Sequence, residues 1–427
     1  MKILFINVVC GIRSTGRICT DLAAELEKEG HEVRIAYGRE NVPEKYEKYA
    51  IRIGSDTAVK IHGLEARLFD GCGRGSRRAT RSFLQWAEEF DPDVLWLHNI
   101  HGYYLNVFEL FDWIKSRPKM KVKWTLHDCW AFTGHCSYFT AVKCDKWKTG
   151  CEKCPQKKAY PASILLDNSK RNYRDKKRCF TGVKDMELIT PSRWLADLTR
   201  ESFLKEYPVS VVYNRIDRSV FKPSPGDFRK KYGIGDGIMI LGVASVWEPR
   251  KGLEDFYRLA KMLDPRYVIV LVGLDASQTD LVPQKIGLPA ERTEVGNSTV
   301  YAFGGASTEN RENGAAGDIP KTKGRGIVIS QGAENIYAAI TGREHPEPAE
   351  DAKDCVSRII CIPRTANAAE LAEIYTAADF FVNPTYEDNY PTVNLEAKAC
   401  GTTVITYDTG GAAETLRDDT AEEGETE

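Results

Sequence analysis

The chain opens with a strand–helix–strand pattern that restricts the fold more than any other feature of the sequence. Residues 2–8 read KILFINV, a nearly continuous apolar run of the kind found in strands buried on both faces. A helical pattern, DLAAELEKEG, follows and stops at Gly30, and residues 31–37 (HEVRIAY) form the next apolar run. A βαβ opening of this type predicts a parallel sheet covered by helices on both faces.

The alternation continues to about residue 416 and divides into two units. In the first unit, further strands are expected at 93–98, 122–127, near 189 and at 209–214. In the second unit, they are expected at 237–246, 267–274, 359–364, 379–384 and 402–407. We therefore predict an α/β protein with two Rossmann-like, doubly wound parallel-sheet domains, at 1–218 and 219–416, followed by an acidic tail at 417–427.

Residues 277–354 interrupt the second unit. The part that reads GGASTENRENGAAGD has too few apolar residues to bury a core. Long connections without regular structure are uncommon inside compact domains. We interpret this stretch as a largely flexible insertion without a catalytic role, in which GIVIS and ENIYAAI form a local strand and helix.

Composition and charge exclude several classes of protein. Of the residues, 42% are hydrophobic, and 59 basic against 61 acidic residues leave a net charge of −2. A chain without an overall basic excess is not a general nucleic-acid binder. The apolar runs are far shorter than a membrane-spanning helix requires, and the N-terminal run lacks a signal-peptide cleavage site. We therefore expect a cytoplasmic protein whose 12 Cys are mostly reduced.

The charge is nevertheless unevenly distributed. Residues 115–185 contain 18 Lys and Arg against 6 Asp and Glu, which gives a local charge of +12. Two interpretations remain for this stretch. It is either a solvated surface or a face that meets an anionic partner, such as the inner face of a membrane.

Four cysteines in this basic stretch have the spacing C-x7-C-x6-C-x2-C, and they are Cys136, Cys144, Cys151 and Cys154. Four thiolates at such a spacing suit a tetrahedral zinc ion, which would be structural because no coordination position stays open for chemistry. Free buried thiols are the alternative. A disulfide is the least favoured interpretation in a reducing compartment.

A glycine-containing segment, GIRSTGR, lies between the first strand and the first helix. Glycines at this place let backbone N–H groups approach a phosphate. The segment is not a P-loop, because Arg17 and Ile18 stand where a P-loop has Lys and Ser or Thr. Gly16 and Arg17 are therefore candidate phosphate or sugar contacts, and a plain strand-to-helix turn is the alternative.

Histidines follow two predicted strands of the first unit. His127 and Asp128 stand at the end of one strand, and His98 ends another. In open α/β sheets, ligands bind beyond the carboxyl ends of the strands. We therefore expect a substrate site near His127, with structural histidines as the alternative.

In the second unit, Arg250 and Lys251 follow a predicted strand and precede a predicted helix. Cations at this place form a site for a diphosphate, and two surface cations beside a helix are the alternative. Glu387 and Asp388 lie in the loop after another strand, and Glu396 lies on the next helix. Carboxylates suit sugar and ribose hydroxyls because each accepts two O–H hydrogen bonds.

Glycines follow the last predicted strand of the second unit, in the segment GGAAE that begins at Gly410 and Gly411. Two loops that carry acidic residues therefore flank a loop that carries cations. This arrangement predicts a nucleotide-sugar pocket.

Together these segments resemble the retaining glycosyltransferases of the GT-B fold, in the family-four group. Within that group, they resemble the colanic-acid and capsule-type transferases of bacterial surface polysaccharide synthesis. The resemblance covers residues 1–274 and about 358–416, and it rests on STGRI, LHDCWAFTGHC, CPQKKAYPAS, TPSRWLADL, YNRIDRSVFKP, VWEPRKGL and PTYEDNYPTVNLEAKACGTTVITYDTGG.

The resemblance implies two Rossmann-like domains facing a cleft. It further implies transfer of a hexose from a nucleotide diphosphate sugar, with UDP or GDP as the nucleotide, to a lipid-linked saccharide acceptor. The anomeric configuration would be retained, no metal cofactor would take part in catalysis, and neither domain would bind nucleic acid.

The resemblance also implies roles for individual residues. Arg250 and Lys251 would hold the donor diphosphate, and Glu396 would bind the ribose hydroxyls. The remaining expected contacts are His127 beside the sugar, Asp388 or Glu387 on the donor sugar, Gly410 and Gly411 in the donor pocket, and Gly16 with Arg17 near a phosphate or the acceptor.

Two departures from the family pattern bear on these roles. Val246 stands where the family has an Arg five residues before the Lys, which leaves Arg250 as its substitute. Family members continue well past the position of Glu414, with a helix that crosses back to the first domain. A truncated, non-catalytic relative that binds nucleotide or a protein partner is therefore the second hypothesis.

Overall fold

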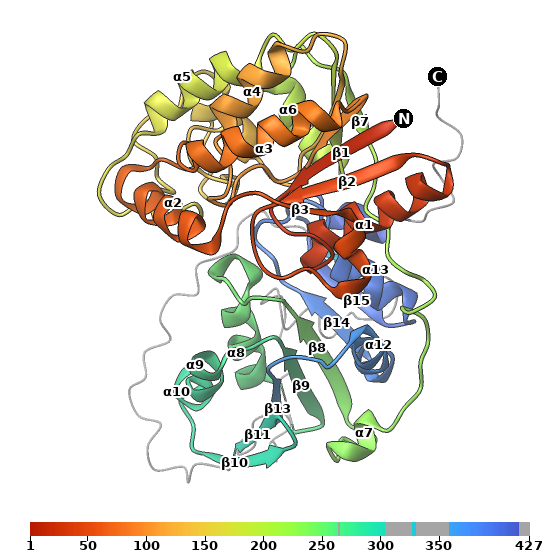
Figure 1. Cartoon of the computed structure of the whole chain (residues 1–427). Coiled ribbons are helices and arrows are strands. Elements are labelled where there is room, and N and C mark those ends of the chain that lie inside the picture. Colours follow the sequence, from red (N-terminus) through yellow and green to blue (C-terminus); the bar gives the residue numbers. More distant parts are fainter. Residues whose placement is uncertain (264, 304–326, 330–357, 418–427) are drawn as a thin grey trace. The chain divides into compact units, whose positions relative to one another are not determined.

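The computed structural model describes residues 1–263, 265–303, 327–329 and 358–417. The chain divides into two compact units, Met1–Asn214 and Arg215–Glu427. The division falls close to the boundary expected at residue 218. Each unit is built around its own sheet (Figure 1).

Unit 1 contains a sheet of seven parallel strands in the order β3-β2-β1-β4-β5-β6-β7. Its strands are β1 (Lys2–Asn7), β2 (Glu32–Tyr37), β3 (Ala50–Arg52), β4 (Val94–Leu97), β5 (Lys121–Thr125), β6 (Met186–Thr190) and β7 (Val209–Val211). The strand order reverses between β1 and β4. Such a switch point is the place where ligands bind in open α/β sheets.

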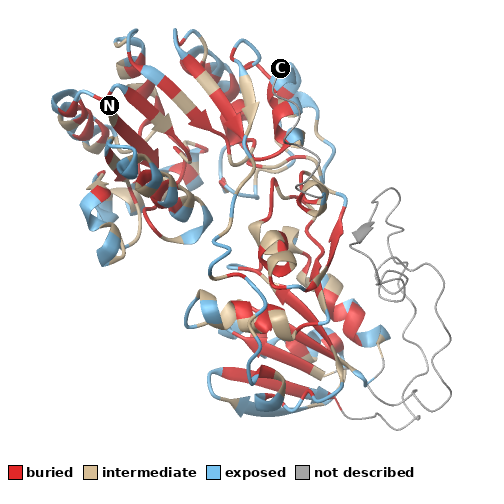
Figure 2. Cartoon of the chain, turned by 90° about the vertical axis from the view of Figure 1, so that its right-hand side faces the viewer, coloured by how far each residue is buried: buried red, intermediate tan, exposed pale blue. Residues whose placement is uncertain are grey.

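Helices cover both faces of this sheet, and they are α1 (Arg13–Lys28), α2 (Asp56–Phe69), α3 (Arg77–Phe90), α4 (Val107–Lys115), α5 (Ser169–Phe180) and α6 (Arg193–Glu201). Successive side chains of a strand point to opposite faces of the sheet, so alternate residues of β1 are buried in two different hydrophobic cores. Ile3 and Phe5 pack with residues of α1, whereas Leu4 and Ile6 pack with residues of α3 to α6. The continuous apolar run in β1 is explained by this burial on both faces (Figure 2).

Unit 2 contains a mixed sheet in the order β10-β11-β13-β9-β8-β14-β15-β12. Its five parallel strands are β8 (Ile238–Val243), β9 (Tyr267–Val272), β13 (Arg358–Ile362), β14 (Phe380–Asn383) and β15 (Thr403–Tyr407). Their order repeats that of unit 1, so the switch point lies between β8 and β14. Outside residues 276–303, the α-helices in the described part of unit 2 are α7 (Phe228–Lys231), α8 (Leu253–Met262), α12 (Ala368–Ala377) and α13 (Thr392–Ala399).

The expectation that residues 277–354 form a largely flexible insertion is wrong for their first part. Residues up to 303 fold into α9 (Ala276–Asp280), α10 (Val282–Ile286), β10 (Ala290–Val295) and β11 (Ser298–Phe303). The hairpin of β10 and β11 joins the sheet because β11 pairs antiparallel with β13 and buries Val300, Tyr301 and Phe303.

A short strand, β12 (Ile327–Ile329), also lies within the predicted insertion, at the GIVIS segment. It pairs antiparallel with β15. The rest of the predicted insertion, 304–326 and 330–354, lies outside the described residues, as does the acidic tail from residue 418. Among the helices that the structure describes, none is long and apolar enough to cross a membrane.

Candidate functional site

The candidate site of unit 2 is centred on an ion pair between Lys251 and Asp388. Lys251 ends a short 3-10 helix, Pro249–Lys251, that follows β8, and Asp388 lies in the loop after β14. The Lys251 Nζ lies 2.5 Å from the Asp388 Oδ2. Because β8 and β14 are parallel neighbours, both loops leave the same edge of the sheet, at its switch point.

The Asp388 side chain is 14% exposed, so its charge depends on its neighbours. Burial opposes ionisation of this carboxyl group, but the nearby cations Lys251 and Arg250 outweigh burial and hold its pKa below the usual range. Asp388 is therefore a carboxylate at neutral pH. Sequence reasoning named all three residues, and the structure brings them together.

Arg250 is fixed by the same loops. Its guanidinium donates from Nη1 to the backbone oxygen of Glu387, at 2.9 Å, and from Nε to Glu248, at 2.9 Å. A further hydrogen bond connects the same two loops, because the backbone N–H of Tyr386 donates to the backbone oxygen of Arg250, at 2.7 Å. Two adjacent cations are thus held at the switch point by backbone hydrogen bonds between the loops after β8 and β14.

The loop after β15 packs directly onto Asp388. The N–H of Gly411 donates to the backbone oxygen of Asp388, at 3.1 Å. Gly410 has a φ of +61°, and a Cβ at this position would lie 2.0 Å from the same oxygen. The structure therefore gives Gly410 a packing role, because only glycine allows this close approach.

The two other acidic residues that the sequence suggested for this site, Glu396 and Glu387, are both buried. Glu396 lies on α13 and is 4% exposed, and its Oε2 accepts a hydrogen bond from the Tyr375 hydroxyl, at 3.2 Å. Glu387 is 5% exposed, and its backbone oxygen accepts from Arg250.

In unit 1, two histidines meet beyond the ends of β4 and β5. The Nδ1 of His98 lies 2.9 Å from the Nε2 of His127, and the two rings are stacked. Burial lowers the pKa of His127 to about 4 and that of His98 well below its usual range. Both rings are therefore neutral at pH 7, with one nitrogen of the contact donating and the other accepting.

A second set of polar side chains, connected by hydrogen bonds, lies next to this pair of histidines. His101 contacts Asp128 through Nε2, at 3.0 Å, and the Tyr160 hydroxyl through Nδ1, at 3.0 Å. The side chain of Asp128 thus faces His101, and it also accepts from the N–H of Trp130, at 2.8 Å. Sequence reasoning missed Tyr160, because it lies in an irregular segment 59 residues after His101 and no local pattern connects the two.

Gly16 and Arg17 lie inside a helix rather than in a loop. Helix α1 begins at Arg13, so only Val8–Ile12 connects it to β1. Gly16 is buried, and a Cβ there would lie 3.0 Å from Val9 and 3.2 Å from the N of Gly11, whereas Arg17 is exposed. The structure therefore gives Gly16 a packing role at the start of α1.

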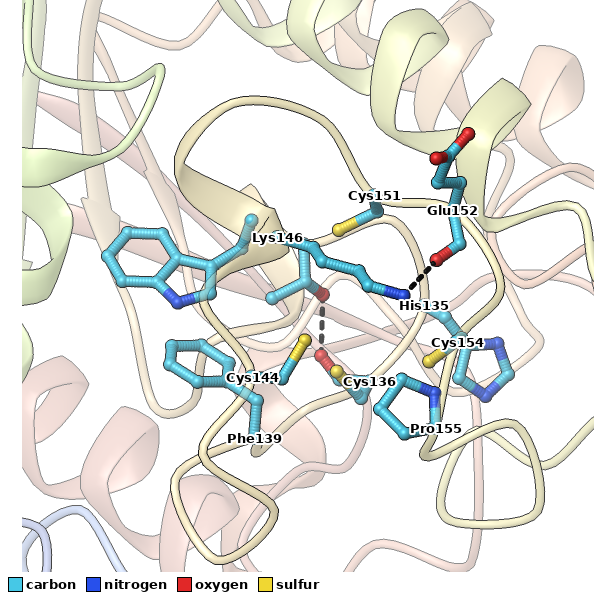
Figure 3. Close-up of a pocket in the computed structure, with 11 residues that line it drawn as sticks. His135, Cys136, Phe139, Cys144, Lys146, Cys151, Glu152, Cys154 and Pro155 are labelled. Carbon is cyan, nitrogen blue, oxygen red and sulfur yellow. Dashed lines mark hydrogen bonds between the residues drawn. The ribbon is translucent and has the colours of Figure 1, made fainter.

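The four clustered cysteines of unit 1 line one small cavity (Figure 3). All four are free thiols, and the thiols of Cys136 and Cys154 are in hydrogen-bonding contact. Within the ranges that the structure describes, however, no three His, Cys, Asp or Glu side chains are already grouped as ligands of a metal ion.

Comparisons with known proteins agree with this architecture. The model of Glycosyltransferase Family 4 matches residues 15–220, and that of Glycosyl transferases group 1 matches residues 327–425. The two matches fall on different units. The fold is thus that of a two-domain α/β protein in which each unit is built on a doubly wound sheet. The chain belongs to the glycosyltransferases of the GT-B fold, in the family-four group.

Curated relatives match over short segments. A candidate colanic acid biosynthesis glycosyl transferase of Escherichia coli (strain K12), WcaC, is 35% identical over 112 residues, which are 25% of this chain and 27% of that protein. A D-inositol 3-phosphate glycosyltransferase of Streptomyces bingchenggensis (strain BCW-1) is 40% identical over 63 residues, 15% of this chain and 14% of that protein. The matched segments thus span about a quarter and about a seventh of these relatives.

Solved structures match over nearly the whole chain at low identity. A sucrose-phosphate synthase of Thermosynechococcus elongatus has a TM-score of 0.59 and 15% identity, covering 97% of this chain and 83% of that chain. Anabaena HepE in complex with UDP-glucose has a TM-score of 0.53 and 14% identity, covering 98% and 83%. WaaG, a glycosyltransferase involved in lipopolysaccharide biosynthesis, has a TM-score of 0.51 and 15% identity, covering 96% and 82%. At this identity, the likeness establishes the fold.

Proposed function

We propose that this protein transfers a hexose from a nucleotide diphosphate sugar to a saccharide acceptor in the synthesis of a surface polysaccharide. The observation that carries the proposal is the fixed cation pair Arg250 and Lys251 at the switch point of unit 2, beside the carboxylate of Asp388. The family membership and the polysaccharide-related relatives support it. Transfer proceeds with retention of the anomeric configuration, and no metal takes part in the chemical step.

The donor diphosphate binds Arg250 and Lys251 in this proposal. When the bond between the anomeric carbon and the diphosphate oxygen breaks, negative charge develops on the leaving diphosphate, and both cations stabilise it. Their hydrogen bonds to the loop after β14 hold them in place before the donor arrives, which lowers the reorganisation that the reaction requires.

The donor sugar and ribose contact carboxylates of the same unit. Asp388 or Glu387 accepts from the sugar hydroxyls, and Glu396 accepts from the ribose. Gly410 and Gly411 belong to the same proposed pocket, where Gly410 packs against the backbone of Asp388 and the N–H of Gly411 donates to it. Complexes of HepE with UDP-glucose make UDP the first nucleotide to test.

In unit 1, His127 is the group proposed to contact the sugar. His98 fixes its Nε2, and burial keeps its ring neutral at pH 7, so His127 acts as a hydrogen-bonding group and not as a charge. Gly16 and Arg17 are proposed to lie near the acceptor or a phosphate, where the exposed Arg17 supplies a positive charge.

We further propose that the acceptor is lipid-linked and that unit 1 contacts an anionic membrane surface. The carrying observation is a cluster of exposed apolar side chains on α2 and on the segment that follows Ser163. They are Ile61 (55% exposed), Leu64 (59%), Phe69 (52%), Ile164 (67%), Leu165 (60%) and Leu166 (47%). The two segments are joined, because the N–H of Ile164 donates to the backbone oxygen of Arg67, at 2.6 Å.

Basic residues accompany this apolar cluster. Lys60 and Arg67 lie about one turn to either side of Leu64 on α2, and Lys158 precedes the second segment by a few residues. Apolar side chains next to lysine and arginine are typical of surfaces that insert into the interface of an anionic bilayer. The local charge of +12 over residues 115–185 would also attract unit 1 to an anionic membrane surface.

Thermal unfolding with and without UDP or GDP tests the donor site. A ligand that binds only the folded chain adds about 2.7 kcal/mol at 100 times its Kd, which gives a clear upward shift in Tm. We expect a shift with one nucleotide, its loss in Lys251→Ala, and its retention in Lys285→Ala, which removes an exposed lysine of the same unit that pairs with Glu254.

Product analysis then tests the chemistry. A sugar released or transferred from the nucleotide with its anomeric configuration retained, in the presence of a chelator, supports the full proposal. Nucleotide binding without sugar release favours the second hypothesis, a binding protein without catalysis. A folded chain that binds neither nucleotide contradicts the proposed transfer and favours the form of the second hypothesis in which the chain binds a protein partner.

A further inference from the structure

We infer that Cys136, Cys144, Cys151 and Cys154 form a structural zinc site in unit 1, separate from the donor site. Their side chains line a cavity of about 10 Å³, which is about the room that one water-sized species needs. The sulfurs are not yet grouped as ligands, so binding requires their side chains to rotate toward the centre of the cavity. Zinc–sulfur bonds of about 2.3 Å would result.

The other walls of the cavity are partly apolar, and they also carry His135 and Glu152, two side chains of types that can bind a metal. Phe139 and Trp147 stack on each other, at 5.0 Å between ring centroids, and form an apolar side. His135 is in contact with Asp70 through Nδ1, at 2.6 Å, and the Glu152 carboxylate accepts from Lys170, at 3.2 Å. Two further polar side chains of the lining contact backbone groups. Thr133 donates to the backbone oxygen of Cys136, at 2.5 Å, and Lys146 donates to that of Glu152, at 2.9 Å (Figure 3). The four thiols of the lining are the groups that we assign as ligands of the ion.

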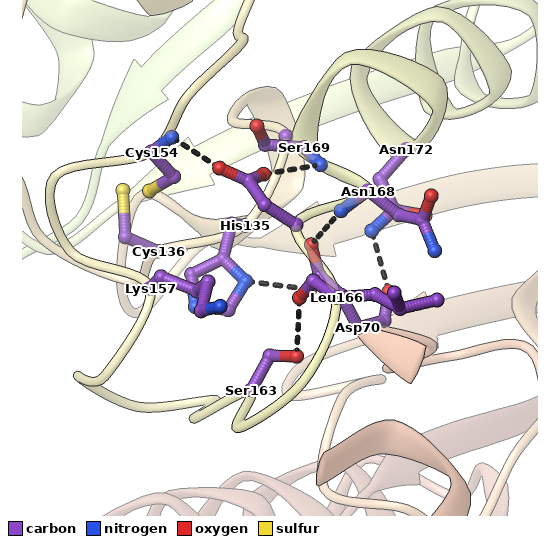
Figure 4. A network of polar contacts seen from close by, with 12 residues as sticks. Asp70, His135, Cys136, Cys154, Lys157, Ser163, Leu166, Asn168, Ser169 and Asn172 are labelled. Atoms are coloured by element: carbon purple, nitrogen blue, oxygen red, sulfur yellow. Dashed lines mark hydrogen bonds and ion pairs between the residues drawn. The ribbon is translucent and has the colours of Figure 1, made fainter. Parts of the chain in front are cut away.

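Backbone contacts already position two of these cysteines. The N–H of Gly134 donates to the Cys151 sulfur, at 3.2 Å, a contact that stabilises a metal-bound thiolate. Glycine is required there, because a Cβ would lie 2.2 Å from the backbone oxygen of Ser169. The N–H of Cys154 donates to Asp167, at 2.6 Å, and Asp167 also accepts from the N–H of Ser169 (Figure 4).

A buried cation compensates the charge of such a site. Four thiolates and one Zn²⁺ carry a net charge of −2, which is costly in a buried loop. Lys176 is 3% exposed, and its amine donates to the backbone oxygens of Trp130 and Thr133, at 2.7 and 3.1 Å. It lies within electrostatic range of Cys136 and Cys151, so its positive charge offsets part of the negative charge of the site.

The zinc site would hold a long segment that has little regular structure. Between β5 and α5, the structure contains only two 3-10 turns, Trp130–Phe132 and Lys146–Lys148. The side chain of His135 ties this segment to Asp70, at 2.6 Å (Figure 4). The same segment carries Tyr160 to its contact with His101. Zinc at the cysteines therefore fixes the segment that completes the histidine cluster.

Metal analysis of the purified, tag-free full chain tests the inference. We expect about one zinc per chain, as a four-cysteine site binds a single ion. Zinc should be lost in Cys151→Ser and in Cys154→Ser, and it should be retained in Cys179→Ser, which changes a buried thiol of unit 1 that does not line the cavity.

A second measurement does not depend on the folding of variants. Titration of the parent chain with a mercurial thiol reagent, followed with a zinc-sensitive dye, should release the zinc as the thiols react. The inference is overturned by a parent chain that takes up no zinc from zinc-supplemented medium, by unchanged zinc in both variants, or by an intact mass that shows a disulfide among the four cysteines. None of these results depends on nucleotide binding.

Discussion

Lys251 and Asp388 are separated by 137 residues in the chain and yet form an ion pair of 2.5 Å. Their loops follow β8 and β14, which are parallel neighbours at the switch point of the second sheet. Because the side chains are only 20% and 14% exposed, the pair is protected from most of the screening that weakens surface ion pairs. The proposed diphosphate site is therefore organised before any ligand binds.

The first prediction concerns this ion pair. Lys251→Met leaves the Asp388 carboxylate largely buried without its nearest cation, and we expect it to destabilise the fold by about 2–4 kcal/mol. Asp388→Asn in the Lys251→Met background should recover part of that loss, because the uncompensated charge is removed. A double-mutant cycle from urea unfolding measures the coupling, which we expect at about 1–3 kcal/mol. Additive effects of the two changes would contradict the ion pair.

The second prediction concerns the close approach of Gly410 to Asp388. Gly410→Ala places a Cβ 2.0 Å from the Asp388 oxygen at a φ of +61°. Gly287→Ala is the matched control, because Gly287 has a φ of +78° and a Cβ added there would have no atom within 4 Å. We expect the control to cost about 1 kcal/mol of strain and Gly410→Ala to cost clearly more. Equal losses in thermal unfolding would show that Gly410 is not held against Asp388.

The sequence predicted the two sheets well, because their strands are buried on both faces and therefore appear as apolar runs. It also placed Arg250, Lys251 and Asp388 in the loops that follow two such strands, β8 and β14. It failed at residues 277–303, where β10 has exposed side chains from Glu291 to Glu294 and α9 and α10 have only five residues each. It also missed Tyr160, whose position is set by tertiary contacts of an irregular segment.

The third prediction is a loss of stability in mild acid. Burial lowers the pKa of His62 to about 4, whereas the unfolded state has a pKa of about 6.5. Above about pH 6.5 both states are neutral. As the pH falls from about 6.5 to 4, only the unfolded state binds a proton, so His62 reduces the free energy of unfolding by up to about 3 kcal/mol.

Tryptophan fluorescence is the suitable readout for this pH dependence, because seven of the 8 tryptophans lie in Met1–Asn214. His62→Asn should flatten the dependence of the unfolding free energy on pH between about 6.5 and 4. The variant also loses the hydrogen bond that His62 Nε2 accepts from the N–H of Gly75, so its stability at pH 8 should be lower. An unchanged slope would show that the pKa of His62 is the same in the folded and the unfolded chain.

The fourth prediction tests the membrane surface. Ile164→Glu combined with Leu165→Glu puts two charges on the most exposed part of the apolar cluster. We expect co-sedimentation with anionic liposomes to fall at least about tenfold, because each apolar side chain of this size contributes about 1.5–3 kcal/mol when fully buried. Leu281→Glu, at a 43% exposed position of unit 2, should leave sedimentation unchanged. Nucleotide-induced shifts in Tm should be equal in all three chains.

The hairpin of β10 and β11 has a consequence for solubility. In the part of the chain that the structure describes, β10 is the outermost strand of the second sheet, and its residues Glu291 to Glu294 are exposed and mostly charged. An edge of this kind discourages strand addition from other molecules. Without the hairpin, the backbone of β13 would be open along the apolar sequence IICI, a template for aggregation. The hairpin, which the sequence predicted as part of a flexible insertion, thus protects unit 2 from self-association.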